Sequence, residues 1–198
     1  MTTIDVTTTP QALARPRLHR PGFLREVIET LILIVVIYAL VNLATVRFFI
    51  DGPSMQPNFH AGEFLIVSRV SYLLGAPERG DVVVFNAPGN SDDDPPLIKR
   101  LIGMPGDTVE MRDRQVYVNG AQISEPYVLQ EECASLCRDD VWQLGADEYF
   151  FMGDNRNNSR DSRRFGPVRR DQIVGEAFIR YWPPPQWGIV EHFRFSGG

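Results

Sequence analysis

The sequence predicts a mainly β protein: an antiparallel, barrel-like or sandwich-like domain preceded by one N-terminal membrane-spanning helix. Residues 1–50 carry five Arg and three acidic residues around one long apolar run, whereas residues 51–198 carry 15 basic and 22 acidic groups. Short β-rich runs separated by turn residues follow one another through this second part, and no segment there keeps a helical period beyond three turns. Its length is that of one domain with its own core.

Composition excludes several other classes of protein. The chain has a formal net charge of −5, so it has no excess of basic groups to neutralise phosphates, and nucleic acid is not an expected partner. Two Cys and three scattered His do not make an evident zinc site. We therefore expect no metal and no cofactor.

The apolar run contains 17 uncharged residues, from Thr30 to Val46. At ~1.5 Å per residue it spans roughly 25 Å, and apolar residues on either side extend it to the ~30 Å of a bilayer core. A buried core helix and a cleavable signal peptide are the alternatives, but no small-x-small cleavage site follows the run. We predict an anchor helix over residues 23–50, after a disordered cytoplasmic tail at residues 1–22.

The distribution of Arg gives this anchor a direction. Four Arg precede the apolar run, and only Arg47 follows it within 20 residues. Because positive flanks stay in the cytoplasm, residues 51–198 are expected to form an extracytoplasmic domain. A disulfide between Cys133 and Cys137 fits that oxidising compartment, with two free thiols as the alternative.

Seven β-rich runs in the second part are predicted to be strands. Asn119-Gly120 lies between the short runs Val116–Val118 and Ala121–Ile123 and is a strong signal for a two-residue hairpin turn. Pro, Gly and three consecutive Asp mark residues 86–96 as an exposed loop. The predicted strands are Phe64–Val67, Val82–Phe85, Leu97–Ile102, Thr108–Met111, Gln115–Val118, Tyr149–Met152 and Ile173–Trp182.

Lys99 is the only lysine among 20 basic residues. Arg keeps its proton in proteins, whereas Lys loses it when it is desolvated. On a strand, Lys99 shares one face with Leu97 and Leu101, and Arg100 points to the other face. That apolar setting would lower the pKa of Lys99, although an ordinary exposed lysine fits the spacing equally well.

Two further segments carry candidate polar groups. Ser54 lies in a bend that contains Gly and Pro, just after the anchor, where another backbone can approach closely. Residues 153–163 place short polar and charged side chains directly after a predicted strand. Each segment alone is more typical of an ordinary turn. The three His, the usual bases for a serine nucleophile, are expected at the surface.

Together these segments resemble the motifs of type I signal peptidases, the membrane-anchored serine proteases that remove signal peptides from exported proteins. The resemblance is to the single-anchor, Gram-positive-like form and covers most of residues 23–182. The self-cleaving repressors of the SOS response also use a Ser/Lys pair, but they are cytoplasmic and start with a DNA-binding domain. The matching motifs, in family order, are GPSMQP at 52–57, IKRLIGMPGD at 98–107 and GDNRNNSRDSR at 153–163.

The resemblance implies Ser54 as the nucleophile and Lys99 as the general base. It also implies that Ser159 orients the lysine amine through a hydrogen bond. Some family members bind the oxyanion with a serine hydroxyl two residues before the nucleophile; Gly52 stands there in this chain, which leaves only the Ser54 backbone N–H assigned as a donor. The residues implied to support this region are Asp154, Asn155, Arg156, Asp161 and Arg163.

The substrate implied by the resemblance is an extended signal peptide of an exported preprotein, cleaved after small residues at −1 and −3. Extended peptides bind by adding a strand to a sheet edge, and the expected edges are residues 49–53 and 96–98. The other expected partner is the lipid bilayer, in the plasma (inner) membrane of a bacterium. Trp182 and Trp187 either reach the interfacial zone or pack on the core. The candidate substrate-binding residues are Ile50, Gly52, Pro53, Met55, Leu97 and Ile98.

Two other functions stay open at this point. One is a non-enzymatic anchored β domain that binds peptides or envelope partners, and the other is an inactive relative that acts as a scaffold. The intact trio of Ser54, Lys99 and Ser159 favours the enzyme, because a binder needs none of the three and an inactive relative would usually lack one.

Overall fold

The computed structural model describes residues 22–91, 93–128 and 137–195, so the expected tail lies outside these ranges except for Gly22. Helix α1 (Phe23–Ala44) is long and apolar enough to cross a membrane, and none of its side chains is buried. The helix predicted over residues 23–50 is too long, because β1 (Thr45–Phe49) is a strand. The β-branched and aromatic side chains of that segment favour an extended chain.

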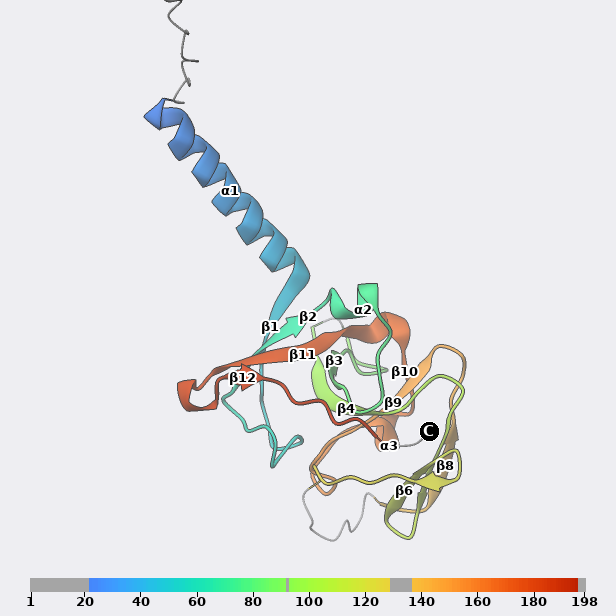
Figure 1. Ribbon diagram of the computed structural model, residues 1–198. Coiled ribbons are helices and arrows are strands. Elements are labelled where there is room, and N and C mark those ends of the chain that lie inside the picture. Colours follow the sequence, from blue (N-terminus) through green and yellow to red (C-terminus); the bar gives the residue numbers. More distant parts are fainter. Residues whose placement is uncertain (1–21, 92, 129–136, 196–198) are drawn as a thin grey trace, which may run out of the picture. The chain divides into compact units, whose positions relative to one another are not determined.

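From β1 onward, the described residues form two antiparallel sheets (Figure 1), which confirms the predicted fold class. The larger sheet has the order β1-β2-β11-β3-β4-β9-β10, with β12 paired to β11, and the smaller sheet has the order β7-β6-β5-β8. The other strands of the larger sheet are β2 (Phe64–Ser68), β3 (Val82–Phe85), β4 (Leu97–Gly103), β9 (Glu148–Met152), β10 (Val168–Arg169), β11 (Ile173–Trp182) and β12 (Gly188–Ile189). The smaller sheet contains β5 (Thr108–Arg112), β6 (Gln115–Val118), β7 (Ala121–Gln122) and β8 (Asp140–Gln143).

The helices after α1 are single turns. They are α2 (Ser71–Leu74), α3 (Ser162–Phe165), η1 (Arg170–Gln172) and η2 (Pro184–Gln186). All seven predicted strands are present with nearly the predicted ends. The hairpin at Asn119-Gly120 is also confirmed, since both residues have positive φ, 51° and 80°, between β6 and β7.

Strand β4 lies inside the larger sheet, and both of its faces are covered. On one face, Ile98 packs in a hydrophobic cluster with Ile50 and Met55. On the other face, Leu101 packs with Phe151 and other aromatic residues. This double burial explains why the strand reads as a continuous apolar run interrupted only by two basic residues.

One stretch of β4 has an edge that no strand of the described residues pairs with. Strand β9 pairs with β4 only from Arg100 onward, because β9 ends at Met152. On the opposite side, the Leu101 N–H donates to the Asp81 carbonyl oxygen, so Leu101 directs its backbone groups away from β9. Since successive residues of a strand alternate in direction, the N–H and C=O of Ile98 point toward the free side. A sheet edge therefore lies where the sequence predicts one, at residues 96–98.

Candidate active site

Strand β4 and the turn after β1 bring Lys99 and Ser54 into contact. The Lys99 Nζ donates a hydrogen bond to the Ser54 Oγ at 2.8 Å and another to the Ile98 carbonyl oxygen at 2.7 Å. Lys99 is only 3% exposed, whereas Ser54 is partly exposed. Gly52 has a φ of 111°, a conformation that glycine adopts without steric cost, and it lets the chain bend toward Lys99.

The environment of Lys99 favours its neutral form. Burial lowers the pKa of Lys99 to about 8, and the charges of Asp161 and Asp154 oppose this only in part. These carboxylates form ion pairs with Arg163 and Arg100, and no described carboxylate forms one with Lys99. At mildly alkaline pH, a large fraction of the amine can therefore accept a proton from the adjacent hydroxyl.

Asn155 fixes the backbone of the Ser54 turn. Its N–H donates to the Ser54 carbonyl oxygen at 3.1 Å, and its Nδ2 donates to the Pro53 carbonyl oxygen at 3.2 Å. With both carbonyl oxygens held on this side, the orientation of the Ser54 peptide unit is set. The supporting role expected for Asn155 thus has a concrete form.

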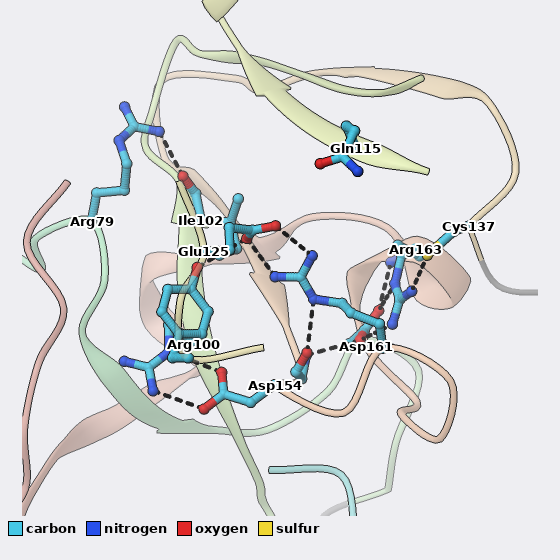
Figure 2. A network of polar contacts seen from close by, with 12 residues as sticks. Arg79, Arg100, Ile102, Gln115, Glu125, Cys137, Asp154, Asp161 and Arg163 are labelled. Carbon is cyan, nitrogen blue, oxygen red and sulfur yellow. Dashed lines mark hydrogen bonds and ion pairs between the residues drawn. The ribbon is translucent and has the colours of Figure 1, made fainter. Parts of the chain in front are cut away.

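A buried ion pair lies behind Asn155. Figure 2 shows the Asp154 carboxylate bound by both ends of the Arg100 guanidinium, at 2.9 and 2.7 Å. The same carboxylate accepts a hydrogen bond from the Asn58 Nδ2 at 2.8 Å, and the guanidinium lies 4.2 Å from the centroid of the Tyr127 ring. Buried charges need such partners, because an unpaired one is strongly destabilising. Sequence reasoning missed Asn58, which connects the segment after Ser54 to this ion pair.

A second pair fixes the start of the loop after β9. Asp161 is bound by both ends of the Arg163 guanidinium, at 2.9 and 2.8 Å, and accepts a hydrogen bond from the Gly153 N–H at 2.9 Å. Burial alone would raise the pKa of Asp161, but these hydrogen bonds and the charge of Arg163 hold it below its usual range. Arg163 also donates to the Sγ of Cys137, which is disulfide-bonded; Cys133, its expected partner, lies outside the described residues.

Arg156 completes the support of this loop. Its Nε donates to the Gly153 carbonyl oxygen at 3.0 Å, and its Nη1 donates to the Glu125 carboxylate at 2.8 Å (Figure 2). Glu125 is 31 residues away in the sequence and was not among the expected site residues. The loop after β9 is therefore held at several points through buried charges.

Ser159 is buried beside Gly153 and close to Asp161, whose pKa it helps to lower. The described hydrogen bonds of the Lys99 amine go to the Ser54 Oγ and the Ile98 carbonyl oxygen. The orienting role of Ser159 that the resemblance implies therefore stays a prediction.

The candidate substrate-binding residues fall into two groups. Ile50, Met55 and Ile98 are buried together in one hydrophobic cluster, so their contact with a substrate stays a prediction. The other three remain partly exposed near Ser54: Gly52, Pro53 and Leu97.

Among the described residues, neither His60 nor His192 forms a hydrogen bond or an ion pair with Ser54 or Lys99. His60 is exposed, as expected, but the expectation of a surface position is wrong for His192, which accepts a hydrogen bond from the Val82 N–H at 3.1 Å. Asp81, Glu176 and His192 lie close enough together to suggest a metal site. However, Asp81 is already bound by Arg194, the Tyr72 hydroxyl and the Glu78 N–H, so an ion-pair network accounts for this cluster.

Gly153 supplies a sharp test of this packing. A Cβ at this position would overlap the Ser159 Oγ and would lie 2.5 Å from the Ser54 carbonyl oxygen. We expect Gly153→Ala to lower kcat by about 10²-fold, because displacements near 1 Å in an active site cost about that much. The measurement is the rate of peptide-bond cleavage, together with a thermal unfolding curve.

Gly188→Ala is the matched control for that variant. No heavy atom lies within 4 Å of the position of its Cβ, so its activity should equal that of the unmodified protein. If Gly153→Ala cleaved at the rate of this control, the close approach of the loop to the nucleophile turn would have no catalytic importance.

The chain thus has an apolar helix followed by a β domain, and in that domain a buried lysine amine contacts a serine hydroxyl. The sequence model of the family described as "Signal peptidase, peptidase S26" matches residues 24–182, and the chain belongs to this family.

Curated relatives agree with that membership. A probable signal peptidase I-2 of Synechocystis is 39% identical over 147 residues, which cover 72% of this chain and 65% of the relative. Signal peptidase I of Bacillus caldolyticus is 36% identical, with 74% of this chain and 87% of the relative covered. Signal peptidase IB of Staphylococcus aureus (strain COL) is 35% identical, with 80% of this chain and 91% of the relative covered. The chain thus spans just under two thirds of the first of these relatives and most of the other two.

Proposed function

We propose that this protein is a membrane-anchored serine endopeptidase that removes N-terminal signal peptides from exported preproteins, with Ser54 as the nucleophile and Lys99 as the general base. The observation that carries the proposal is the 2.8 Å contact between the Ser54 Oγ and the Nζ of a lysine that is only 3% exposed. The family membership and the relatives support the choice of substrate.

The proposed reaction proceeds in two halves. The Ser54 Oγ attacks the scissile carbonyl carbon while the neutral Lys99 Nζ takes the hydroxyl proton. The resulting tetrahedral intermediate collapses, and the protonated amine gives its proton to the departing amino group of the mature protein. Water then attacks the acyl-serine ester with Lys99 again as the base, which releases the signal peptide as a carboxylate and restores Ser54.

The negative oxygen of the intermediate needs donors that are already in place. The Ser54 N–H is the proposed donor, since it donates to no acceptor among the described residues and its peptide unit is fixed by Asn155. No second donor is assigned, because Gly52 offers no side chain at the position where some family members have a serine.

The free edge of β4 is the proposed binding site for the substrate. An extended peptide can pair with the outward N–H of Ile98 and so place its scissile bond beside Ser54. Gly52, Pro53 and Leu97 are partly exposed around this path and are the proposed contacts for small side chains at −1 and −3. The large neighbouring core residues leave little depth there, which favours small side chains.

We further propose an orientation and a location. The helix α1 crosses the plasma membrane of a bacterium, with its Arg-rich flank in the cytoplasm and residues 51–198 outside. Ser54 follows the last helical residue by ten positions, so the chain keeps the nucleophile within about 35 Å of the helix end. A signal peptide held in the same bilayer would present its cleavage site in this zone.

The experiment that tests the function uses the full chain in lipid vesicles with a preprotein that carries Ala at −1 and −3. The expected result is a mature product whose new N-terminus, read by mass spectrometry, follows the −1 residue. A preprotein with Phe at −1 serves as the control and should stay uncut. Equal cleavage of both preproteins, or of neither, would contradict the proposed specificity or activity.

The pH dependence of cleavage follows from the pKa of Lys99. Because the neutral amine is the base and its pKa is about 8, the rate should rise roughly tenfold per pH unit below that value and level off above it. The measurement is kcat/KM for a short peptide between pH 5 and 10. A profile that is flat down to pH 5 would exclude Lys99 as the base.

A further inference from the structure

After α1, the most exposed large apolar side chains of the described residues lie in α2, in the connection between β2 and β3. Leu73 is 80% exposed and Leu74 is 86% exposed. Single exposed leucines are common on protein surfaces, but two adjacent ones with almost complete exposure suggest a partner surface.

The turn that carries these leucines is fixed to the domain. The Tyr72 ring is buried, and its hydroxyl donates to the Asp81 carboxylate at 2.9 Å. The Ser71 hydroxyl donates to the Ser68 hydroxyl at 2.8 Å, and the Arg170 guanidinium donates to the Tyr72 carbonyl oxygen. Because the backbone is held at these points, the two leucines are kept outward instead of folding back onto the core.

The same turn lies beside the residue at which the apolar helix ends. Thr45 pairs with Ser68 in the β1–β2 register, and the Arg69 N–H donates to the Ala44 carbonyl oxygen at 2.9 Å. Ala44 is the last residue of α1, whose length and composition fit a membrane span. Figure 1 shows α2 at the end of β2 where β1 begins. The exposed leucines are therefore continuous with the point at which the chain leaves the bilayer.

Charge at this level also fits a lipid surface. Arg47 and Arg69 are exposed, and both lie within a few residues of the Ala44–Arg69 hydrogen bond. Basic side chains beside a membrane exit attract anionic headgroups, whereas leucines reach the boundary between headgroups and acyl chains. A lipid surface is thus favoured over a protein partner for this turn.

We propose that Leu73 and Leu74 insert into the bilayer beside the end of α1, with Arg47 and Arg69 at the anionic headgroups. The β domain then has two contacts with the membrane, one covalent through α1 and one through α2. Two contacts limit tilting of the domain and keep the free edge of β4 at a constant height for a membrane-held substrate.

The competing contact lies at the other end of the same strands. Trp182 pairs with Phe64, which pairs with Phe49, four residues along β1 from Thr45. This separates the Trp182 end from the helix end by roughly 13 Å along the strand. Insertion of the strand ends that carry Trp182, Phe64 and Phe49 into the bilayer, in place of α2, is therefore a separate outcome that the test can distinguish.

The experiment places an environment-sensitive fluorophore (NBD) on Leu74→Cys in the full chain, reconstituted in vesicles of phosphatidylethanolamine and phosphatidylglycerol. Cys137 is disulfide-bonded, so labelling under non-reducing conditions addresses the new thiol. Val141→Cys in β8 is the matched control, since Val141 is apolar and 59% exposed. The proposal expects blue-shifted emission at residue 74 and strong quenching by lipids with a nitroxide high on the acyl chain, with neither effect at residue 141.

A second label separates insertion from mere proximity to α1. Ala76 is exposed in the same connection, and NBD on Ala76→Cys should lose several-fold of its lipid quenching when Leu73→Asp and Leu74→Asp are added. Emission from residue 74 at the aqueous wavelength would overturn the proposal, as would quenching at residue 76 that the two aspartates leave unchanged. Lipid quenching at Trp187→Cys without quenching at Leu74→Cys would assign the contact to the aromatic end instead.

Discussion

Ser54→Ala should abolish cleavage of a preprotein, with a loss in kcat/KM of about 10⁴-fold or more, because the variant lacks the atom that forms the acyl intermediate. The fold should persist, since Ser54 is partly exposed and its carbonyl oxygen keeps the hydrogen bond from the Asn155 N–H. The measurement is a single-turnover assay with the protein in excess over the preprotein, followed long enough to detect slow cleavage.

Ser91→Ala is a suitable control for this loss. Ser91 is an exposed loop serine whose hydroxyl donates to the Asp94 carboxylate. It forms no described hydrogen bond with Lys99 or Ser54. Its removal should leave the rate unchanged. Retained processing by Ser54→Ala would remove the proposed nucleophile and revive the binding domain as the better function.

The strands were predictable where local signals coincide with burial. Strand β3 consists of three Val and one Phe, all of them buried, so composition alone gives its bounds. Strand β1 was missed because its first residues continue the apolar run of α1, and Arg47 with the apolar residues after it also fits the end of a membrane span. Strand β8 was missed because its pattern is mostly exposed and it pairs at a sheet edge.

The sequence identified candidate site residues, but it did not identify most of the contacts that hold them in place. The alternating apolar face leaves a buried and an exposed Lys99 equally open, and the structure shows the lysine buried. The support from Asn58 and Glu125 could not be read locally, since these side chains meet Asp154 and Arg156 across 96 and 31 residues. A motif match names Ser159, but it does not say which group the hydroxyl faces, since this depends on how the buried side chain packs beside Gly153 and Asp161.

Lys99→Met should lower kcat/KM by about 10³- to 10⁴-fold, because general-base assistance contributes up to this amount and methionine accepts no proton. Lys99→Arg should fail equally, since a guanidinium keeps its proton at every working pH. The measurement is kcat/KM for a short peptide at pH 9, where the unmodified lysine is largely neutral. Cleavage by either variant near the normal rate would contradict the assigned base.

Stability distinguishes a lost base from a lost fold. The folded-state pKa of Lys99 is lowered from 10.5 to about 8, so the unfolded chain binds this proton more tightly. Lys99 therefore lowers the free energy of unfolding by its full amount below about pH 8, and this destabilisation disappears as the pH rises toward 10.5. Lys99→Met removes this penalty and should unfold at pH 7 at no lower temperature than the unmodified protein. An inactive variant that is equally or more stable would place the loss in the chemistry, whereas a destabilised one would show that the amine mainly holds the Ser54 turn together.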